Sequence, residues 1–80
     1  PVFISRGVKV QSKRMVGMDG KHLKLSLTDG RFTLDAIGFR LGDLFEDLPS
    51  QVDVLYTFEA NEFNERINLQ LNLKDIRAAA

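Results

Sequence analysis

The chain has 80 residues, enough for one small domain, and its 44% apolar and 28% charged residues exclude a disordered tail. No apolar run approaches the roughly 18 residues that a membrane-spanning helix needs, and the absence of cysteine excludes disulfides, thiolate catalysis and a cysteine zinc site. Eleven basic residues balance eleven acidic ones, so a nucleic-acid surface would require the charges to segregate onto faces.

The chain begins at Pro1 without an initiator methionine and ends in three alanines. We interpret residues 1–77 as one domain of a larger protein and residues 78–80 as a linker or tail. The lack of cysteine agrees with a reducing, cytoplasmic compartment, and nothing in the composition indicates a membrane partner.

The first expected element is a long strand from Val2 to about Val16, interrupted by Gly7. A glycine inside a strand often marks a bulge or a bend at a barrel corner. The segment 17–20, with two glycines, then forms a loop into the second strand.

A hairpin is expected next, because alternating apolar and polar residues over 22–28 and 31–36 flank Asp29-Gly30. A two-residue Asp-Gly turn between such runs is the strongest short-range hairpin signal. It sets a register that places Lys24 opposite Asp35 as a surface ion pair. The inward pairs in this register are all apolar: Leu27 with Phe32, Leu25 with Leu34, and Leu23 with Ala36.

The following segment leaves the strand pattern and predicts a short helix. Its apolar residues recur at helical spacing, at Leu41, Leu44, Phe45 and Leu48. Asp43 and Glu46 are placed like an N-terminal cap and its partner, and Pro49 ends the element.

Two further strands form a second hairpin, with alternation over 52–58 and 67–73. Apolar pairing sets Phe58 opposite Ile67, and residues 60–65 form the loop. Glu59 then faces Arg66 on the outside.

Three strands, a short helix and two strands are the element order of an all-β, five-stranded OB-type barrel, with the helix plugging one end between strands three and four. A small open sheet with one helix across a face is the alternative. The long, bent first strand favours closure.

Catalytic chemistry has little support in this sequence. His22 is the single histidine, with no second histidine and no cysteine to share a metal, so we assign it no catalytic role. No nucleophile motif, phosphate-binding glycine loop or EF-hand spacing is present. We therefore expect this domain to be no enzyme by itself and to hold no cofactor.

The outer face of strands two and three is more informative, because it is basic and rich in hydroxyl groups. It carries Lys24, Ser26, Thr28, Arg31 and Thr33, with Ile37 and Phe39 beyond them and Arg40 next. Cations that track phosphates beside a ring that stacks on a base suit single-stranded nucleic acid, and OB folds bind oligonucleotides on this face and its flanking loops. Those loops add Arg14, Lys21, Phe63, Asn64 and Arg66. Alternatively, Ile37 and Phe39 pack under the helix or against a neighbouring domain.

Several long strings carry a family resemblance. VGMDGKHLKL (Val16–Leu25) and DAIGF (Asp35–Phe39), followed by LGDL, resemble successive segments of the RecJ single-strand-specific exonuclease family. NEFN (Asn61–Asn64) and LQLNLKDIR (Leu69–Arg77) resemble the closing pattern of the same region, and Pro1-Val2-Phe3 resembles the end of the linker into it. The resemblance covers nearly the whole chain.

The resemblance implies an OB domain that lies C-terminal to catalytic domains of the same parent chain. Those domains, which carry the Asp-His-His motif and are expected to use Mn²⁺ or Mg²⁺, are absent here. It implies an accessory domain that binds single-stranded DNA for a 5′–3′ exonuclease of DNA repair and recombination. Two positions depart from the family pattern: Phe63 stands where Trp is frequent, and Glu65, a negative charge, stands where Gly is common. A structural domain that braces the catalytic core with little DNA contact is the alternative.

Overall fold

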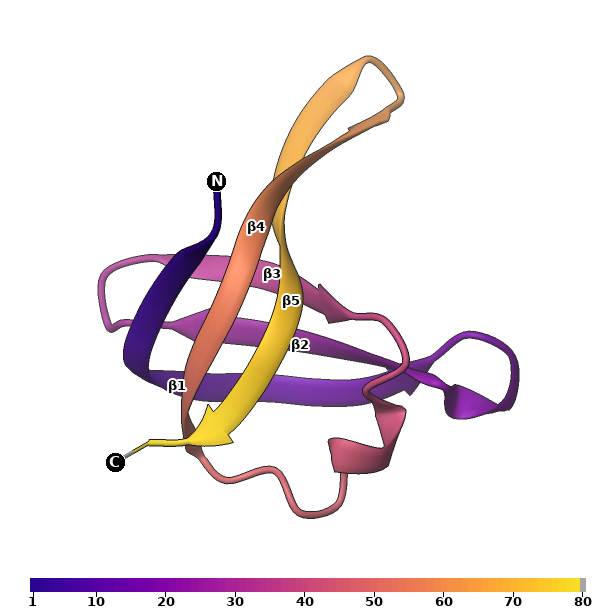
Figure 1. Ribbon diagram of the computed structural model, residues 1–80. Coiled ribbons are helices and arrows are strands. Elements are labelled where there is room, and N and C mark those ends of the chain that lie inside the picture. The colour runs from indigo at the N-terminus through magenta and orange to yellow at the C-terminus, as the bar shows by residue number, and fades with distance from the viewer. Residues whose placement is uncertain (80) are drawn as a thin grey trace.

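The computed structural model describes residues 1–79, apart from the side chains of residues 61 and 63. In chain order the elements are β1 (Phe3–Val16), the 3₁₀ turn η1 (Met18–Gly20), β2 (His22–Thr28), β3 (Thr33–Gly38), the 3₁₀ turn η2 (Gly42–Leu44), β4 (Gln51–Phe63) and β5 (Arg66–Ala78). The strands close into a barrel in the order β1-β2-β3-β5-β4 (Figure 1). The all-β, five-stranded OB-type barrel expected from the sequence is confirmed.

Strand β1 bends, and its two halves pair with different neighbouring strands. Its first half pairs with β4, its second half pairs with β2, and the register with β4 shifts between Ser5 and Val8. Gly7 lies within this shift with φ at 67°, a left-handed conformation that glycine adopts without steric cost. Its N–H donates to Asp53 Oδ1 at 2.8 Å. The glycine therefore marks a barrel corner, as the sequence predicts.

The core fills the barrel from alternate positions of its strands. Its buried members are Leu23, Leu25, Leu27, Ala36, Val52, Val54, Tyr56, Leu71 and Leu73. Partly buried Leu41, Phe45 and Leu48, from the segment around η2, pack against this cluster and cover one end of the barrel. The expected plug between strands three and four is therefore in place.

The plug is not the helix that the apolar spacing predicts, but a single 3₁₀ turn followed by further turns. Asp43 does not cap it, since the residue before the turn is Leu41 and no side chain makes a capping bond. The Gly42 N–H donates to the Lys21 carbonyl at 2.9 Å, so the start of the segment bonds to the β1–β2 loop. A stretch this short before Pro49 has too few residues to propagate an α-helix against that docking.

The first hairpin differs from expectation by two residues in register. Thr28 pairs with Thr33 rather than with Arg31. Asp29 Oδ1 accepts the N–H groups of Arg31 and Phe32, both at 2.8 Å, and this closes a four-residue loop instead of a two-residue turn. The aspartate side chain thus competes with the Asp-Gly turn that the sequence favours.

This shift removes the expected ion pair. Lys24 lies opposite Ile37 and Asp35 lies opposite Ser26, and no Lys24–Asp35 ion pair forms within the described part of the chain. A shift of two keeps every side chain on its predicted face, because strand side chains alternate with period two. The inward residues of β2 remain apolar and buried for that reason.

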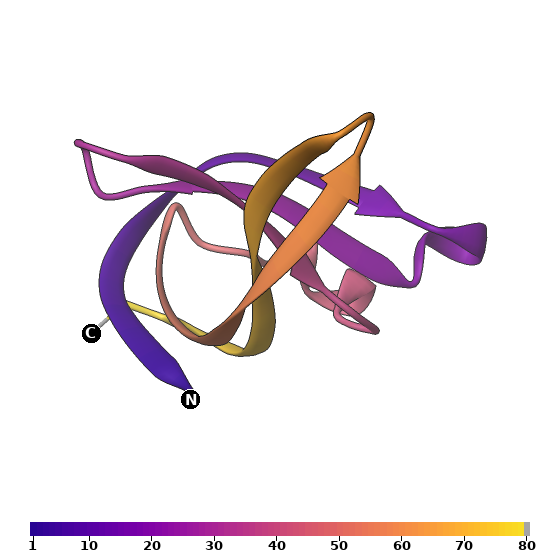
Figure 2. The same cartoon turned by 90° about the horizontal axis from the view of Figure 1, so that it is seen from above.

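The second hairpin is longer than expected, and its register differs by four residues. Phe58 lies opposite Leu71 rather than Ile67, and Glu59 opposite Gln70 rather than Arg66. Most of the expected loop is strand, and the chain reverses at residues 64–65, both with positive φ as in a two-residue hairpin turn. The hairpin consequently projects beyond the barrel (Figures 1 and 2).

Candidate nucleic-acid interface

Two cations lie side by side on the outer surface of β1 and β2. Arg14 is the cross-strand partner of Lys24, and Lys24 faces outward between buried Leu23 and Leu25. Like charges directly opposite each other destabilise a sheet. An anion that contacts both side chains would remove this repulsion, so the pair is suited to a phosphate.

A second group of predicted residues gathers at the adjoining corner, where the β1–β2 loop meets the end of β3. The Arg40 N–H donates to His22 Nδ1 at 3.0 Å, and the Phe39 ring contacts the His22 ring edge-on, with centroids 5.3 Å apart. Arg40 has φ at 63°, which is uncommon for a residue with a side chain. Phe39 is 51% exposed, and Lys21 precedes His22. The corner therefore carries an exposed aromatic ring and two cations.

His22 is the residue that the sequence analysis missed. As an acceptor, its Nδ1 holds the turn that carries Arg40 and leaves the proton of a neutral ring on Nε2. No sequence signal links position 22 to position 40. Their contact becomes visible only when β2 and β3 are paired.

Other predicted residues lie elsewhere. Arg31 is in the loop at the opposite end of the β2–β3 hairpin, where its guanidinium lies 5.9 Å from the Phe32 ring centroid. Asn64 and Arg66 are at the tip of the β4–β5 hairpin, and the Phe63 side chain lies outside the described residues. Ile37, expected among exposed residues, is buried at an outward position opposite Asn72.

A polar groove extends from Lys24 toward the hairpin tip. Strands β3 and β5 pair at Ala36–Leu71 and Ile37–Asn72. Beyond these pairs, the side chains of both strands line a groove together with Lys24: Thr33, Leu34, Asp35, Asn68, Leu69 and Gln70. Amide side chains supply both donors and acceptors, which suits contacts to base edges.

A family model described as the RecJ OB domain matches residues 1–75. The chain belongs to this family. It is also 27% identical over 77 residues to the single-stranded-DNA-specific exonuclease RecJ of Bacillus subtilis (strain 168). That match covers 94% of the chain and 10% of the relative, so this RecJ OB domain spans about a tenth of the length of the curated relative. The family resemblance of the sequence motifs is confirmed.

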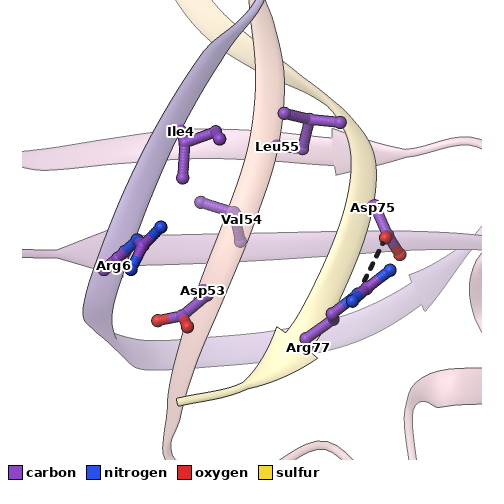
Figure 3. Close-up of a pocket in the computed structure, with 7 residues that line it drawn as sticks. All are labelled: Ile4, Arg6, Asp53, Val54, Leu55, Asp75 and Arg77. Atoms are coloured by element: carbon purple, nitrogen blue, oxygen red, sulfur yellow. Dashed lines mark hydrogen bonds and ion pairs between the residues drawn. The ribbon is translucent and has the colours of Figure 1, made fainter. Parts of the chain in front are cut away.

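The opposite face of the RecJ OB domain carries balanced rather than mainly basic charges (Figure 3). A pocket there, lined by β1, β4 and β5, brings two arginines together with two aspartates: Arg6, Arg77, Asp53 and Asp75. Arg77 Nε donates to Asp75 Oδ2 at 3.2 Å, an exposed pair that contributes about 0–1 kcal/mol. The balanced charges give this face little attraction for a polyanion.

Within residues 1–79 of the RecJ OB domain, no three histidine or acidic side chains come together as a metal site. The same residues contain no helix that is long and apolar enough to cross a membrane.

Proposed function

We propose that this RecJ OB domain is an accessory single-stranded-DNA-binding domain of a RecJ-like 5′–3′ exonuclease in DNA repair and recombination. The supporting observation is that Arg14 and Lys24 are paired on the outer surface of β1 and β2, beside a corner that carries Lys21, Arg40 and exposed Phe39. The chain has no net charge, so this segregation is what makes the surface basic.

In this proposal the cations contact successive phosphates while the Phe39 ring stacks on a base. The groove between β3 and β5 lies next to Lys24, and its amides contact base edges. Three to five phosphate contacts would give a slope of log affinity against log salt of about −2 to −3.5, since each contributes about −0.7 on a single strand. Binding is therefore weak and salt-sensitive.

Hydrolysis in such a parent belongs to other domains of the chain, which would hold Mn²⁺ or Mg²⁺. The described acidic residues of this domain do not cluster in a way that fits these ions. Its contribution is to hold the strand near a separate nuclease centre.

The test is a titration of a fluorescent single-stranded oligonucleotide at several salt concentrations. Phe39→Ala should weaken binding by about 1–3 kcal/mol, or roughly 5- to 150-fold, and leave the salt slope unchanged. Lys24→Gln should flatten the slope by about 0.7. Phe63→Ala tests the second candidate ring, at the hairpin tip.

The matched control is Arg6→Gln, which removes one positive charge from the opposite face. It should leave both affinity and slope unchanged. The proposal fails if the domain does not bind at low salt, or if Arg6→Gln weakens binding as much as Lys24→Gln does.

A further inference from the structure

We propose that the end of the barrel opposite η2 is an interface, covered by a neighbouring domain of a longer parent chain. The surface comprises the exposed apolar side chains at this end and on the same face of the projecting hairpin: Phe3, Phe32, Leu34, Phe58, Ile67 and Leu69. We call it the apolar mouth. Leu34 and Leu69 also line the groove beside Lys24, whereas the basic corner around Phe39 and Arg40 is formed by other residues.

The two ends of the barrel are closed differently. At one end, side chains around η2 cover the core. At the other, a cavity reaches core residues Leu27, Val54 and Leu71, and its lining includes the exposed side chains of Phe32 and Leu34. The hydrophobic core therefore extends to the surface at the apolar mouth.

The hairpin continues this apolar surface outward. Leu69 and Ile67 occupy the same face of β5 as buried Leu71, yet they are 58% and 73% exposed because the hairpin extends past the barrel. Phe58 contacts the Phe3 ring edge-on, with centroids 5.2 Å apart. A group of exposed apolar side chains of this kind is typical of an interaction site.

A protein surface fits the apolar mouth better than a nucleic acid does. No cation lines its cavity, and the one ionic residue there, Asp29, is engaged with backbone N–H groups of its own loop. Phe3, Phe32 and Phe58 offer rings, but Ile67 and Leu69 have none on which a base could stack. In addition, β1 pairs with β4 only as far as Tyr56. The β4 backbone N–H and C=O groups beyond Phe58 therefore have no hydrogen-bond partner on β1.

The length of the family relative argues for a partner in the same polypeptide. The matched segment is 10% of the Bacillus subtilis exonuclease, so nine-tenths of such a chain lies outside the domain. The Phe3 ring stacks on Tyr56 at the mouth, with centroids 5.9 Å apart. In any longer chain, residues that precede Phe3 lie beside this surface, and tethering gives a preceding domain a high effective concentration there.

Hydroxyl-radical footprinting of the longer parent chain, without DNA, tests this inference. The 80-residue domain, checked for folding by circular dichroism, is the reference. We expect oxidation of Phe58, Ile67 and Leu69 to slow several-fold in the longer chain, while Met18, 88% exposed in η1, reacts equally in both. Leu69→Lys in the longer chain should restore oxidation of Phe58.

Equal oxidation of Phe58 and Ile67 in the two proteins would overturn the inference. Protection that instead grows with the concentration of the 80-residue domain would also overturn it, and would identify a second copy as the occupant. Because no DNA is present, this outcome is independent of whether the basic corner binds DNA.

Discussion

The contact between η2 and the β1–β2 loop makes Gly42→Ala the sharpest test of this structure. A Cβ at position 42 would lie inside van der Waals contact of the Gly20 carbonyl oxygen and 2.9 Å from the Lys21 carbonyl carbon and oxygen. These are backbone atoms, which cannot rotate away as a flexible side chain can. The methyl group must therefore push η2 off the loop.

The expected cost follows from two effects. Overpacking costs about 1–3 kcal/mol. Loss of the 2.9 Å bond from the Gly42 N–H to the Lys21 carbonyl adds about 0.5–1.5 kcal/mol. We expect the free energy of unfolding to fall by about 2–4 kcal/mol. A domain of 80 residues typically has an unfolding free energy of about 4–12 kcal/mol, so over most of this range the variant should still fold.

The assay is urea unfolding followed by circular dichroism, with Gly7→Ala as the comparison. Gly7 has positive φ but nothing within 4 Å of its added Cβ, so this variant isolates the backbone cost of about 1–2 kcal/mol, partly offset in the unfolded chain. Gly42 does not have positive φ, so without the steric contact its replacement would stabilise the domain by about 0.4–1 kcal/mol. A Gly42→Ala variant at least as stable as the wild type would refute the reasoning.

Three further predictions concern the core, the first hairpin loop and catalysis. Leu25→Ala, at a position 1% exposed, should lower the unfolding free energy by about 2–5 kcal/mol, whereas exposed Leu69→Ala should change it little in the same urea assay. The N–H groups of Phe32 and Arg31 hold the pKa of Asp29 below its usual range, so the stability that it contributes is present above about pH 4 and lost as the pH falls through the lowered pKa. An Asp29→Asn variant should show a weaker loss of stability over that acid range, and an unchanged loss would contradict this cause. Purified domain should not degrade single-stranded DNA with Mn²⁺ or Mg²⁺; metal-dependent degradation in a nuclease assay would show a site that the described residues do not reveal.

The sequence predicts the barrel and the faces of its strands well because both depend on alternation. Buried Leu23, Leu25 and Leu27 are in the expected positions, and Gly7 marks the corner. The predicted registers of the two hairpins were wrong because register depends on the geometry of the turn, which alternation does not reveal. The Asp29 side chain forms a four-residue loop, and the reversal at 64–65 lacks the glycine that would have identified it.

Prediction of the candidate site was partial for the same reason. Lys24 and Arg14 could be assigned to the outer surface by alternation, but their pairing depends on the β1–β2 register. The contact of His22 with Phe39 and Arg40 depends on how the chain leaves β3, where the apolar spacing favours a helix and the docking of Gly42 favours a turn.

The parallel contact between β3 and β5 also determines how the barrel folds and opens. The β4–β5 hairpin is local and can form within microseconds, whereas the β1–β4 ladder joins Phe3 to Tyr56 across most of the chain and forms late. The β3–β5 seam closes the ring through the pairs Ala36–Leu71 and Ile37–Asn72. Such a short seam opens before the longer ladders do, so amide hydrogen exchange there should be faster than at Leu25. Each opening would briefly join the groove beside Lys24 to the barrel interior.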